Sequence, residues 1–350
     1  MDLVLLFLAA FGITVATVPP LRRWAWRVGL VDRPRDGAHK THAQATPYGG
    51  GAAIWLAIVV CGLAGAAGRR GDAVAQQTIA HLVLAGTVLF LTGLADDRRP
   101  LPPLPRLALQ IGALAILVAT TPALQLPLAT GAPWLSRGLT VLWLAAMTNA
   151  FNFLDNMDGL AAGIAALVGA GLAVMAVLGG QLEVALLAGV TAAASAGFLC
   201  YNFPRASVFM GDAGGLLLGL LAGALGAWLA HARAATGAGP GASLLPLVLL
   251  AVPAYDLVTV SVLRLAHGRP PWLGDRNHIS HRLVALGLSR QAAVGVIFLG
   301  VVLFAAAPMA VSRGSQAAVA AAWIGSGVGL ALLLGLDFRA RRRRAHGNPA

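Results

Sequence analysis

Long apolar segments recur along the whole chain and are separated by short polar ones. Because about 20 apolar residues cross a bilayer as a helix, each segment of this length predicts a membrane span. About eleven spans are predicted, and ten are the alternative because the short fourth segment and the fifth carry the weakest pattern. The pattern is typical of an all-α, polytopic transmembrane helical bundle. The spans fall near 2–20, 50–67, 79–95, 106–122, 137–154, 159–178, 182–200, 212–230, 243–264, 291–309 and 316–336.

The composition agrees with a protein that lies in the bilayer. Hydrophobic residues make up 58% of the 350 residues and charged residues 11%, whereas a soluble domain carries roughly 25% charged residues. The 43 glycines lie mostly in the apolar segments, where small residues let helices pack closely. One integral membrane domain is therefore predicted over 1–336, followed by a basic cytoplasmic tail over 337–350.

The positive residues indicate how the bundle is oriented. If the spans alternate, only five of the 25 Lys and Arg lie on one side, and the other twenty lie on the side of the tail. The positive-inside rule makes the latter side cytoplasmic, with the amino terminus outside and the carboxyl terminus inside. This rule and nearby anionic lipid explain the net charge of +12, so we expect no nucleic-acid partner. The five outside bases are Arg69, Arg70, Arg137, Arg233 and Arg313.

The acidic residues gather on the same side, which no topology rule requires. Only Asp2, Asp72 and Glu183 of the 13 acids lie outside. Carboxylates at the ends of several helices on one membrane face predict a site there, so we expect an active site on the cytoplasmic face. The acids of that side are Asp32, Asp36, Asp96, Asp97, Asp155, Asp158, Asp212, Asp275 and Asp337, with Asp256 nearby in the ninth span.

Two adjacent carboxylates, Asp96 and Asp97, end the third span. Such a pair at a membrane interface can hold a divalent cation through oxygen ligands or accept a proton. The alternative is a polar helix end in which the acids pair with Arg98 and Arg99.

A richer motif joins the fifth and sixth spans. Asn149, Asn152, Asp155 and Asp158 recur three residues apart, which places them on one helical face or on a turn that extends it. A capping role, as the N-cap of the next span, would explain Asp158 alone.

The segment before the eighth span suits a phosphate. Gly211 lets a ligand approach the backbone, and the start of the helix presents free N–H groups. Asp212 could carry the metal that such a phosphate needs, although it could instead act as an N-cap.

The longest cytoplasmic loop carries Arg276, His278, His281 and Arg282. Two imidazoles and two guanidinium groups suit a pyrophosphate, because Arg can bind its oxygens with two parallel hydrogen bonds. A solvated basic loop is the alternative, and a zinc site lacks a further ligand nearby.

Two weaker candidates complete the set. Lys40, the only lysine in the chain, and His42 precede a Pro-Tyr-Gly-Gly-Gly segment. Asp256 lies in an otherwise apolar span, where an ionisable residue is either a functional group or a structural one bonded to a neighbouring helix.

Together these groups indicate phosphoryl transfer onto a lipid. Carboxylates for Mg²⁺, cationic groups for phosphate and a site at the bilayer surface fit a reaction that depends on positioning and charge neutralisation. A membrane transporter is the alternative from another class, but it would place its acids near the middle of the bilayer.

In this order, the motifs resemble those of the polyprenyl-phosphate N-acetylhexosamine-1-phosphate transferases. The resemblance covers about residues 1–310. The segment from His278 to Arg282 is similar to that of the bacterial undecaprenyl-phosphate N-acetylglucosamine-1-phosphate transferases. It resembles less the phospho-N-acetylmuramoyl-pentapeptide transferases, whose loop has three consecutive histidines. The motifs are Asp-Asp at 96–97, Asn-x-x-Asn-Phe-x-Asp-x-x-Asp-Gly-Leu at 149–160, Phe-Met-Gly-Asp at 209–212 and Asp-Arg-x-His-Ile-x-His-Arg at 275–282.

The resemblance implies a reaction at the bacterial plasma (inner) membrane. A phosphate oxygen of undecaprenyl phosphate attacks the phosphorus that bears the sugar in a UDP-N-acetylhexosamine, and UMP leaves. The expected donor is UDP-N-acetylglucosamine. The lipid-linked product would begin a cell-envelope polysaccharide such as lipopolysaccharide, O-antigen or teichoic acid. The pentapeptide transferase stays open as an alternative within the family, and so does a homodimer.

The resemblance also implies roles for individual residues. Asp212 and Asn152 would ligate Mg²⁺, or Mn²⁺ in its place. Asp96 or Asp97 would receive or position the lipid phosphate. Asp155 and Asp158 would line the nucleotide site, and Phe209 would stack on uracil. The pyrophosphate would be held by His278, His281 and Arg282. The remaining substrate-binding residues would be Lys40, His42, Arg106, Asn149 and Arg276.

Three positions depart from the family pattern. Ser280 stands where His is common, Arg106 where Lys is common, and Asn156 where Gly is usual. Arg in place of Lys keeps the charge but changes the geometry. Because no carboxylate is lost, we expect transferase activity, and the choice of sugar stays open.

Overall fold

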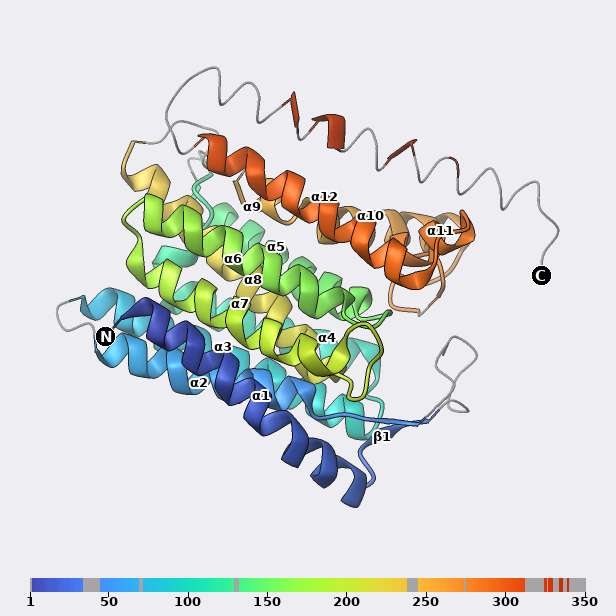
Figure 1. The fold of residues 1–350 in the computed structure, drawn as a ribbon. Helices are drawn as coiled ribbons and strands as arrows, with labels where there is room; N and C mark the ends of the chain where they lie inside the picture. The colour runs from blue at the N-terminus through green and yellow to red at the C-terminus, as the bar shows by residue number, and fades with distance from the viewer. Residues whose placement is uncertain are drawn as a thin grey trace.

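Helices packed side by side form almost all of the described structure (Figure 1). The computed structural model describes residues 2–33, 45–68, 72–128, 132–237, 245–273 and 275–311, with a few short pieces between 324 and 339. The helices are α1 (Leu3–Arg27), α2 (Gly50–Ala67), α3 (Ala73–Arg98), α4 (Pro103–Thr120), α5 (Pro133–Leu154), α6 (Leu160–Leu178), α7 (Leu182–Asn202), α8 (Gly211–Ala235), α9 (Leu245–Leu249), α10 (Ala251–Ala266), α11 (Ile279–Ala285) and α12 (Arg290–Val311), with a 3-10 turn η1 (Pro122–Leu124).

The predicted all-helical, polytopic membrane fold is confirmed. Seven described helices are long and apolar enough to cross a membrane, namely α1 to α4 and α6 to α8. The fifth and tenth predicted spans coincide with α5 and α12, and the ninth is divided between α9 and α10 at Leu250. Most of the eleventh lies outside the described residues. The count of eleven spans, like the alternative of ten, therefore stays a prediction.

Helix α8 is the centre of the bundle. Its apolar stretch is fully buried. It packs mainly against α3 and α5, and also against α2, α6, α7, α9 and η1. Glycines permit this closeness. A Cβ at Gly93 of α3 would lie 2.4 Å from the backbone of Ala213, and one at Gly219 would lie 2.5 Å from the carbonyl of Met147. The start of α8 is thereby held against the end of α3.

A short strand pair, which the hydrophobic pattern did not predict, lies beside the start of α8. Strand β1 (Val31–Asp32) pairs antiparallel with β2 (Thr46–Pro47). The next residue, Tyr48, forms a bridge with Phe209 in the loop before α8. The backbone N–H of Phe209 donates to the carbonyl of Pro47 over 2.9 Å. This pairing ties the segment between α1 and α2 to the loop that precedes α8.

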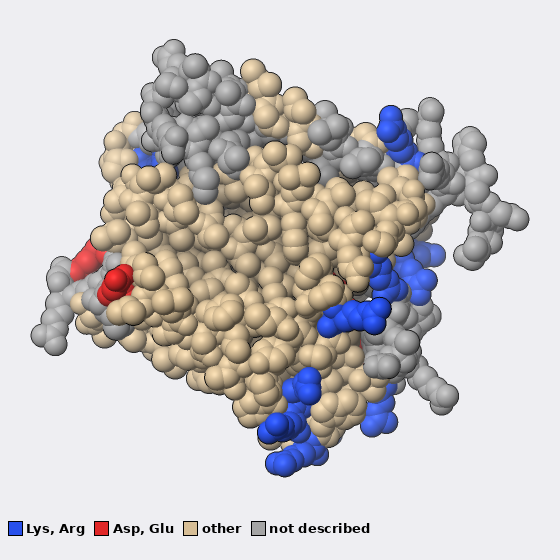
Figure 2. Space-filling view, in the orientation of Figure 1, with Lys and Arg blue, Asp and Glu red and all other residues tan. Residues whose placement is uncertain are grey.

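On the face drawn in Figure 2, charged side chains lie toward the two ends of the bundle. Figure 2 shows a broad uncharged middle, with most of the Lys and Arg along one side and the acids of this face at the opposite side. Large apolar side chains such as Leu8, Leu84 and Ile116 are more than 60% exposed on the helices. An exposed apolar belt between charged ends is typical of a bundle surrounded by lipid.

The orientation in the membrane can be tested with single cysteines. Ala73 at the start of α3 and Ala285 at the end of α11 are both exposed, and the charge distribution puts them outside and inside, respectively. In a background with Cys61 and Cys200 replaced by Ala, Ala73→Cys should react in intact cells with a membrane-impermeant maleimide. Ala285→Cys should react only after the membrane is opened. The reverse pattern would overturn the orientation.

Candidate active site

Polar side chains from distant parts of the chain line one cavity of about 730 Å³. Its wall receives residues from β1, the end of α3, the turn after α5, the loop before α8, the end of α10 and the loop before α11. The structure thus brings together side chains from four polar segments that the sequence singles out. The predicted site residues in this wall are Asp97, Asn152, Asp155, Asp158, Phe209, Asp212, His278 and His281.

The carboxylate of Asp97 holds the start of α8. It accepts the backbone N–H of Asp212 over 2.8 Å and that of Ala213 over 3.2 Å. The first N–H groups of a helix have no partner within the helix and carry partial positive charge, so they favour an acceptor of this kind. Asp212 itself lies in the first turn of α8, so the capping alternative for Asp212 is wrong. Asp97 performs that role from another helix.

Gly211 makes this contact sterically allowed. It adopts φ of +75°, and a Cβ there would lie 2.4 Å from Oδ2 of Asp97. Its φ also lies in the region that favours glycine. In the sequence, Gly211 predicted the close approach of a ligand, whereas in the structure the group that approaches is the carboxylate of Asp97.

Arg106 joins the two ends of the carboxylate cluster. Its Nη1 donates to Oδ2 of Asp96 and, over 2.7 Å, to Oδ2 of Asp212. Asp96 also accepts the backbone N–H of Leu101 over 2.6 Å. The alternative that the Asp-Asp pair is held by Arg98 and Arg99 is therefore replaced by pairing with Arg106 at the start of α4.

The two asparagines on the polar face of α5 have different surroundings, because Asn149 bonds to neighbouring groups and Asn152 lines the cavity. The amide nitrogen of Asn149 donates to Oε1 of Gln110 and to the carbonyl of Ala145, and Asn149 is absent from the cavity wall. One turn later, Oδ1 of Asn152 is buried and lacks a hydrogen-bond partner among the described residues. Such an atom is costly unless something binds it.

Asp158 fastens the turn between α5 and α6 to the loop before α8. Its Oδ2 accepts the backbone N–H of Ala206 over 3.0 Å. The N-cap position of α6 belongs to Gly159, whose N–H donates to Oδ1 of Asn202 over 2.7 Å. The capping alternative for Asp158 is therefore wrong, and the side chain faces the cavity instead.

The donors in this region fit Mg²⁺. This ion prefers oxygen ligands and usually takes one or two from the protein, with water and substrate phosphates completing its shell. The unpartnered Oδ1 of Asn152 and the carboxylate of Asp212, 32% of whose side chain is exposed, are oxygens of that kind. A Cβ at Gly215, one turn after Asp212, would lie 2.7 Å from Oδ1 of Asn152, so this oxygen lies against the first turn of α8. Among the described residues, no three or more His, Cys, Asp or Glu side chains are grouped so that they could hold a metal ion by themselves.

The histidine loop is held by a buried acid. Oδ2 of Asp256 lies 2.7 Å from Nδ1 of His278, and Oδ1 accepts the N–H of Ile279 over 2.6 Å. Asp256 is fully buried. The structural alternative for Asp256 thus describes its contacts, and those contacts orient a cavity residue. Nδ1 of His278 faces this carboxylate. The other ring nitrogen, Nε2, therefore points toward Arg264 and lies 3.4 Å from its Nη2.

Arg264 links α10 to the beginning of this loop. Its guanidinium donates from Nε and Nη2 to the two oxygens of Asp275, each over 3.2 Å, and lies 5.2 Å from the ring centre of Phe153. Burial acts to raise the pKa of Asp275, but the hydrogen bonds from Arg264 and Asn277 outweigh it and hold the pKa below its usual value. Asp275 is therefore an ionised partner of Arg264.

The other predicted residues lie outside this cavity wall. Arg282 is buried, and its Nη2 donates to Oγ1 of Thr259 over 3.3 Å. Arg276 is absent from the wall, and Lys40 and His42 lie outside the described residues. Residues of the wall that the sequence did not select as site residues include Asp32, Tyr48, Arg205, Arg264 and Arg290. Their position on the predicted cytoplasmic side was the available signal.

Comparison with known proteins identifies the family of the chain. A family model described as glycosyl transferase family 4 matches residues 79–230. This range contains Asp96, Asp97, Asp155, Asp158 and Asp212. The chain is 33% identical over 303 residues to the probable undecaprenyl-phosphate N-acetylglucosaminyl 1-phosphate transferase of Bacillus subtilis (strain 168), an alignment that covers 83% of this chain and 80% of that protein. The chain belongs to the polyprenyl-phosphate N-acetylhexosamine-1-phosphate transferase family. This finding confirms the family that the motifs resemble.

Two other relatives carry names from the same family. Identity to the decaprenyl-phosphate N-acetylglucosaminephosphotransferase of Mycolicibacterium smegmatis (strain ATCC 700084 / mc(2)155) is 34% over 342 residues, covering 87% of this chain and 82% of the relative. Identity to the undecaprenyl-phosphate alpha-N-acetylglucosaminyl 1-phosphate transferase of Escherichia coli O157:H7 is 28% over 295 residues, with 81% and 77% covered. The family assignment thus extends over most of the chain.

The buried carboxyl group of Asp155 should make the stability of the folded protein depend on pH. Burial, with smaller effects from the charges of Asp97 and Asp158, raises the pKa of Asp155 to about 7, whereas an unfolded aspartate titrates at about 3.9. Between these values the folded protein keeps a proton that the unfolded chain has lost. The contribution of Asp155 to stability therefore falls as pH rises from about 4 to about 7.

Asp155→Asn should reduce this pH dependence, because an amide does not ionise. From pH 5 to pH 8, the melting temperature of the wild type should fall by about 2 °C or more relative to that of the variant. Thermal unfolding of the detergent-purified proteins, followed by intrinsic fluorescence, measures this difference. Glu183→Gln makes the same charge change at a helix start on the opposite side and should follow the wild type. Parallel curves for wild type and Asp155→Asn would contradict the assignment.

Proposed function

We propose that this protein transfers N-acetylglucosamine-1-phosphate from UDP-N-acetylglucosamine to undecaprenyl phosphate, forming a lipid-pyrophosphate-sugar and UMP. The observation that carries the proposal is that one cavity is lined by Asp97, Asp155 and Asp212 together with His278 and Arg264. The names of the relatives, which specify a polyprenyl phosphate and N-acetylglucosamine, support both the acceptor and the sugar.

The reaction exchanges one phosphorus–oxygen bond for another. An oxygen of the lipid phosphate forms a bond to the phosphorus that bears the sugar, and the bond from that phosphorus to the UMP oxygen breaks. The electron pair of the broken bond stays on the oxygen of UMP and adds to the negative charge of its phosphate. Catalysis of such a displacement depends on holding the two phosphates in line and on neutralising charge.

The carboxylates of α3 support a positioning role. Asp97 is engaged by two backbone N–H groups, and Asp96 by Leu101 and Arg106. These hydrogen bonds fix the orientation of both carboxylates. We therefore propose that Asp96 and Asp97 order the start of α8 and the acceptor phosphate around it.

Asp212 and Asn152 are proposed to hold Mg²⁺, with Mn²⁺ as an alternative. When bound, the ion would neutralise phosphate charge and polarise the phosphorus that is attacked. Arg106, which donates to Asp212, would keep that carboxylate turned toward the cavity.

The opposite wall would bind the donor. His278 is oriented by Asp256 and lies beside Arg264, and His281 and Arg205 also line the cavity. Imidazole and guanidinium groups are donors to the oxygens of a pyrophosphate. Phe209, which lines the same cavity, would offer its ring to the base of the nucleotide.

We place this site on the cytoplasmic face of the bacterial plasma membrane, where a soluble UDP-sugar and a membrane lipid can meet. The charge distribution supports this orientation. A transporter is disfavoured because the charged groups of the cavity wall lie at helix ends and in loops rather than at mid-span. The product would enter the synthesis of a cell-envelope polysaccharide.

Loss of the proposed metal ligand should abolish turnover. Asp212→Asn should lower kcat by at least about 100-fold, because charge stabilisation by a bound cation is worth several kcal/mol in the transition state. The measurement is formation of lipid-linked sugar by purified protein, together with Mn²⁺ binding followed by electron paramagnetic resonance. Asp72→Asn is the matched control, because it makes the same change at the start of α3. Full activity of Asp212→Asn at millimolar Mg²⁺ would contradict the ligand assignment.

The choice of donor separates the two branches of the family. We expect UDP-N-acetylglucosamine to support transfer and UDP-N-acetylmuramyl-pentapeptide to support none. The reason is that a site which hydrogen-bonds a particular sugar discriminates strongly against a donor that leaves those groups unpaired. Radiolabelled lipid products from the two donors, compared at equal concentration, give the answer. A better rate with the pentapeptide donor would overturn the sugar assignment and leave the reaction class intact.

A further inference from the structure

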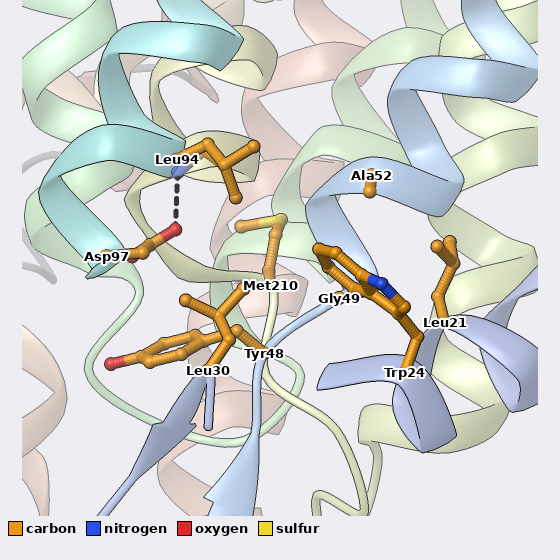
Figure 3. A pocket seen from close by; sticks show the side chains of 10 residues that line it. Leu21, Trp24, Leu30, Tyr48, Gly49, Ala52, Leu94, Asp97 and Met210 are labelled. Carbon is orange, nitrogen blue, oxygen red and sulfur yellow. Dashed lines mark hydrogen bonds between the residues drawn. The ribbon is translucent and has the colours of Figure 1, made fainter. Parts of the chain in front are cut away.

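One side of the polar cavity offers little to a polar donor. There, Tyr48 and Asp97 also line a neighbouring pocket of about 310 Å³ whose wall is mostly apolar, with Leu30 and Met210 among its residues (Figure 3). A nucleotide or sugar placed in that pocket would lose hydrogen bonds to water without replacing them. The polar groups available to the donor are therefore those of the larger cavity, many of which come from the turn after α5 and from the loop that leads into α11.

A hydrogen bond joins this turn to α11. Oγ of Ser280, in the first turn of α11, donates to Oδ1 of Asn156, in the turn after α5, over 2.6 Å. Ser280 is fully buried, whereas Asn156 lines the cavity. A buried hydroxyl needs such a partner, and here the partner lies 124 positions away in the chain. The bond therefore fixes two distant segments against each other at the edge of the site.

The amide of Asn156 is held at both ends. Its Nδ2 donates to the carbonyl of Phe153 over 2.8 Å, and the last carbonyls of a helix such as α5 have no partner within it. Because this carbonyl can only accept, the nitrogen of the amide has to face it, and the oxygen has to face Ser280. The ring of Phe153 also lies edge-on to that of His278, with 6.2 Å between the ring centres. One side chain thus completes the end of α5 and receives α11.

Each of the two bonded residues is next in the chain to a group of the proposed donor site. Asn156 directly follows Asp155, and Ser280 directly precedes His281. Both of these neighbours line the cavity. The hydrogen bond therefore helps to set how far the acids of the turn lie from the imidazoles of the histidine loop.

Asn156 and Ser280 are also two of the positions where the chain departs from the family pattern, which has Gly and His there. Relative to that pattern, position 156 carries an extra side chain and position 280 a smaller one. Asn156 does not have a positive φ, so the backbone of the turn accepts a side chain without strain. The extra amide and the small hydroxyl are in direct contact, so the two departures fit each other.

We propose that Asn156 and Ser280 form a pair of positioning residues, whose hydrogen bond holds the acidic turn and the histidine loop at the separation that the UDP-sugar requires. The pair takes the place of the glycine and histidine of the family pattern as a matched exchange. The proposal rests on the proposed transferase function. Such alignment matters because a misplacement of about 1 Å can slow a reaction by roughly 100-fold.

A cycle of alanine variants tests the pair. Ser280→Ala and Asn156→Ala should each raise the KM for UDP-N-acetylglucosamine by at least about fivefold, because either change removes the same hydrogen bond. The double variant should lie within about twofold of the more impaired single variant, since a shared contact can be lost only once. The KM for undecaprenyl phosphate should stay within about twofold of the wild type, because a loss confined to donor binding leaves the other substrate unaffected.

Ser136→Ala is the matched control for the alanine cycle. Its hydroxyl also belongs to a buried serine in a helix and donates to the carbonyl of Leu126 over 2.8 Å, at the predicted outer end of the bundle. This variant should keep both KM values of the wild type. Additive losses in the double variant would overturn the proposal. Equal increases in the KM of donor and acceptor would also overturn it, because they would show a general structural role.

The residues of the family pattern supply a second cycle. Ser280→His alone should lower kcat/KM for the donor by at least about 20-fold, because a ring at this buried position would overpack against the amide of Asn156. Adding Asn156→Gly should bring the value back to within about threefold of the wild type, since the space is then restored. A double variant as impaired as Ser280→His would overturn the matched exchange. A wild type that forms no lipid-linked sugar would refute the transferase function itself, whereas additive losses in an active enzyme would refute only the pair.

Discussion

The rest of the site depends on one contact, the acceptance of two backbone N–H groups at the start of α8 by the carboxylate of Asp97. These groups have no partner within their own helix, so a carboxylate from α3 completes their hydrogen bonding and fixes the helix end. Gly93 and Gly211 remove the Cβ atoms that would otherwise keep the two helices apart. Because α8 is the buried centre of the bundle, this contact sets the position of Asp212 relative to every surrounding helix.

A second buried acid arranges the opposite wall by similar means. Asp256 accepts the N–H of Ile279 at the start of α11 and holds the imidazole of His278. Arg264, one of the largest fully buried side chains, pairs with Asp275 at the beginning of the same loop. A buried carboxylate or guanidinium group is stable only with charged or hydrogen-bonding partners. The need to satisfy these groups therefore restricts the loop to conformations that bring His278 to the cavity.

The sequence was sufficient to predict the helical bundle and the polar segments of the site, because both depend on local patterns. Apolar runs of bilayer length marked the helices, and Asp155, Asp158 and Asp212 were conspicuous at the ends of such runs. The hydrogen-bond partners of these groups could not be predicted in this way. That Asp97 caps α8, or that Asn149 bonds Gln110 while Asn152 stays open, depends on how distant helices meet. The same limit explains why Asp32 and Tyr48, positioned by a strand pair of two residues each, were not selected.

A site at the ends of membrane helices has to meet two substrates of opposite solubility. The polar cavity offers charged groups to a water-soluble donor, while the exposed apolar side chains of the helices face the bilayer that would hold a lipid acceptor. Asp97 lines this cavity and also fixes the start of α8. The contact that orders the proposed metal ligands thus lies in the wall of the cavity where the two reactants would meet. Positioning of both reactants would then follow from a single helix packing, which is the requirement of a displacement that depends on alignment more than on covalent catalysis.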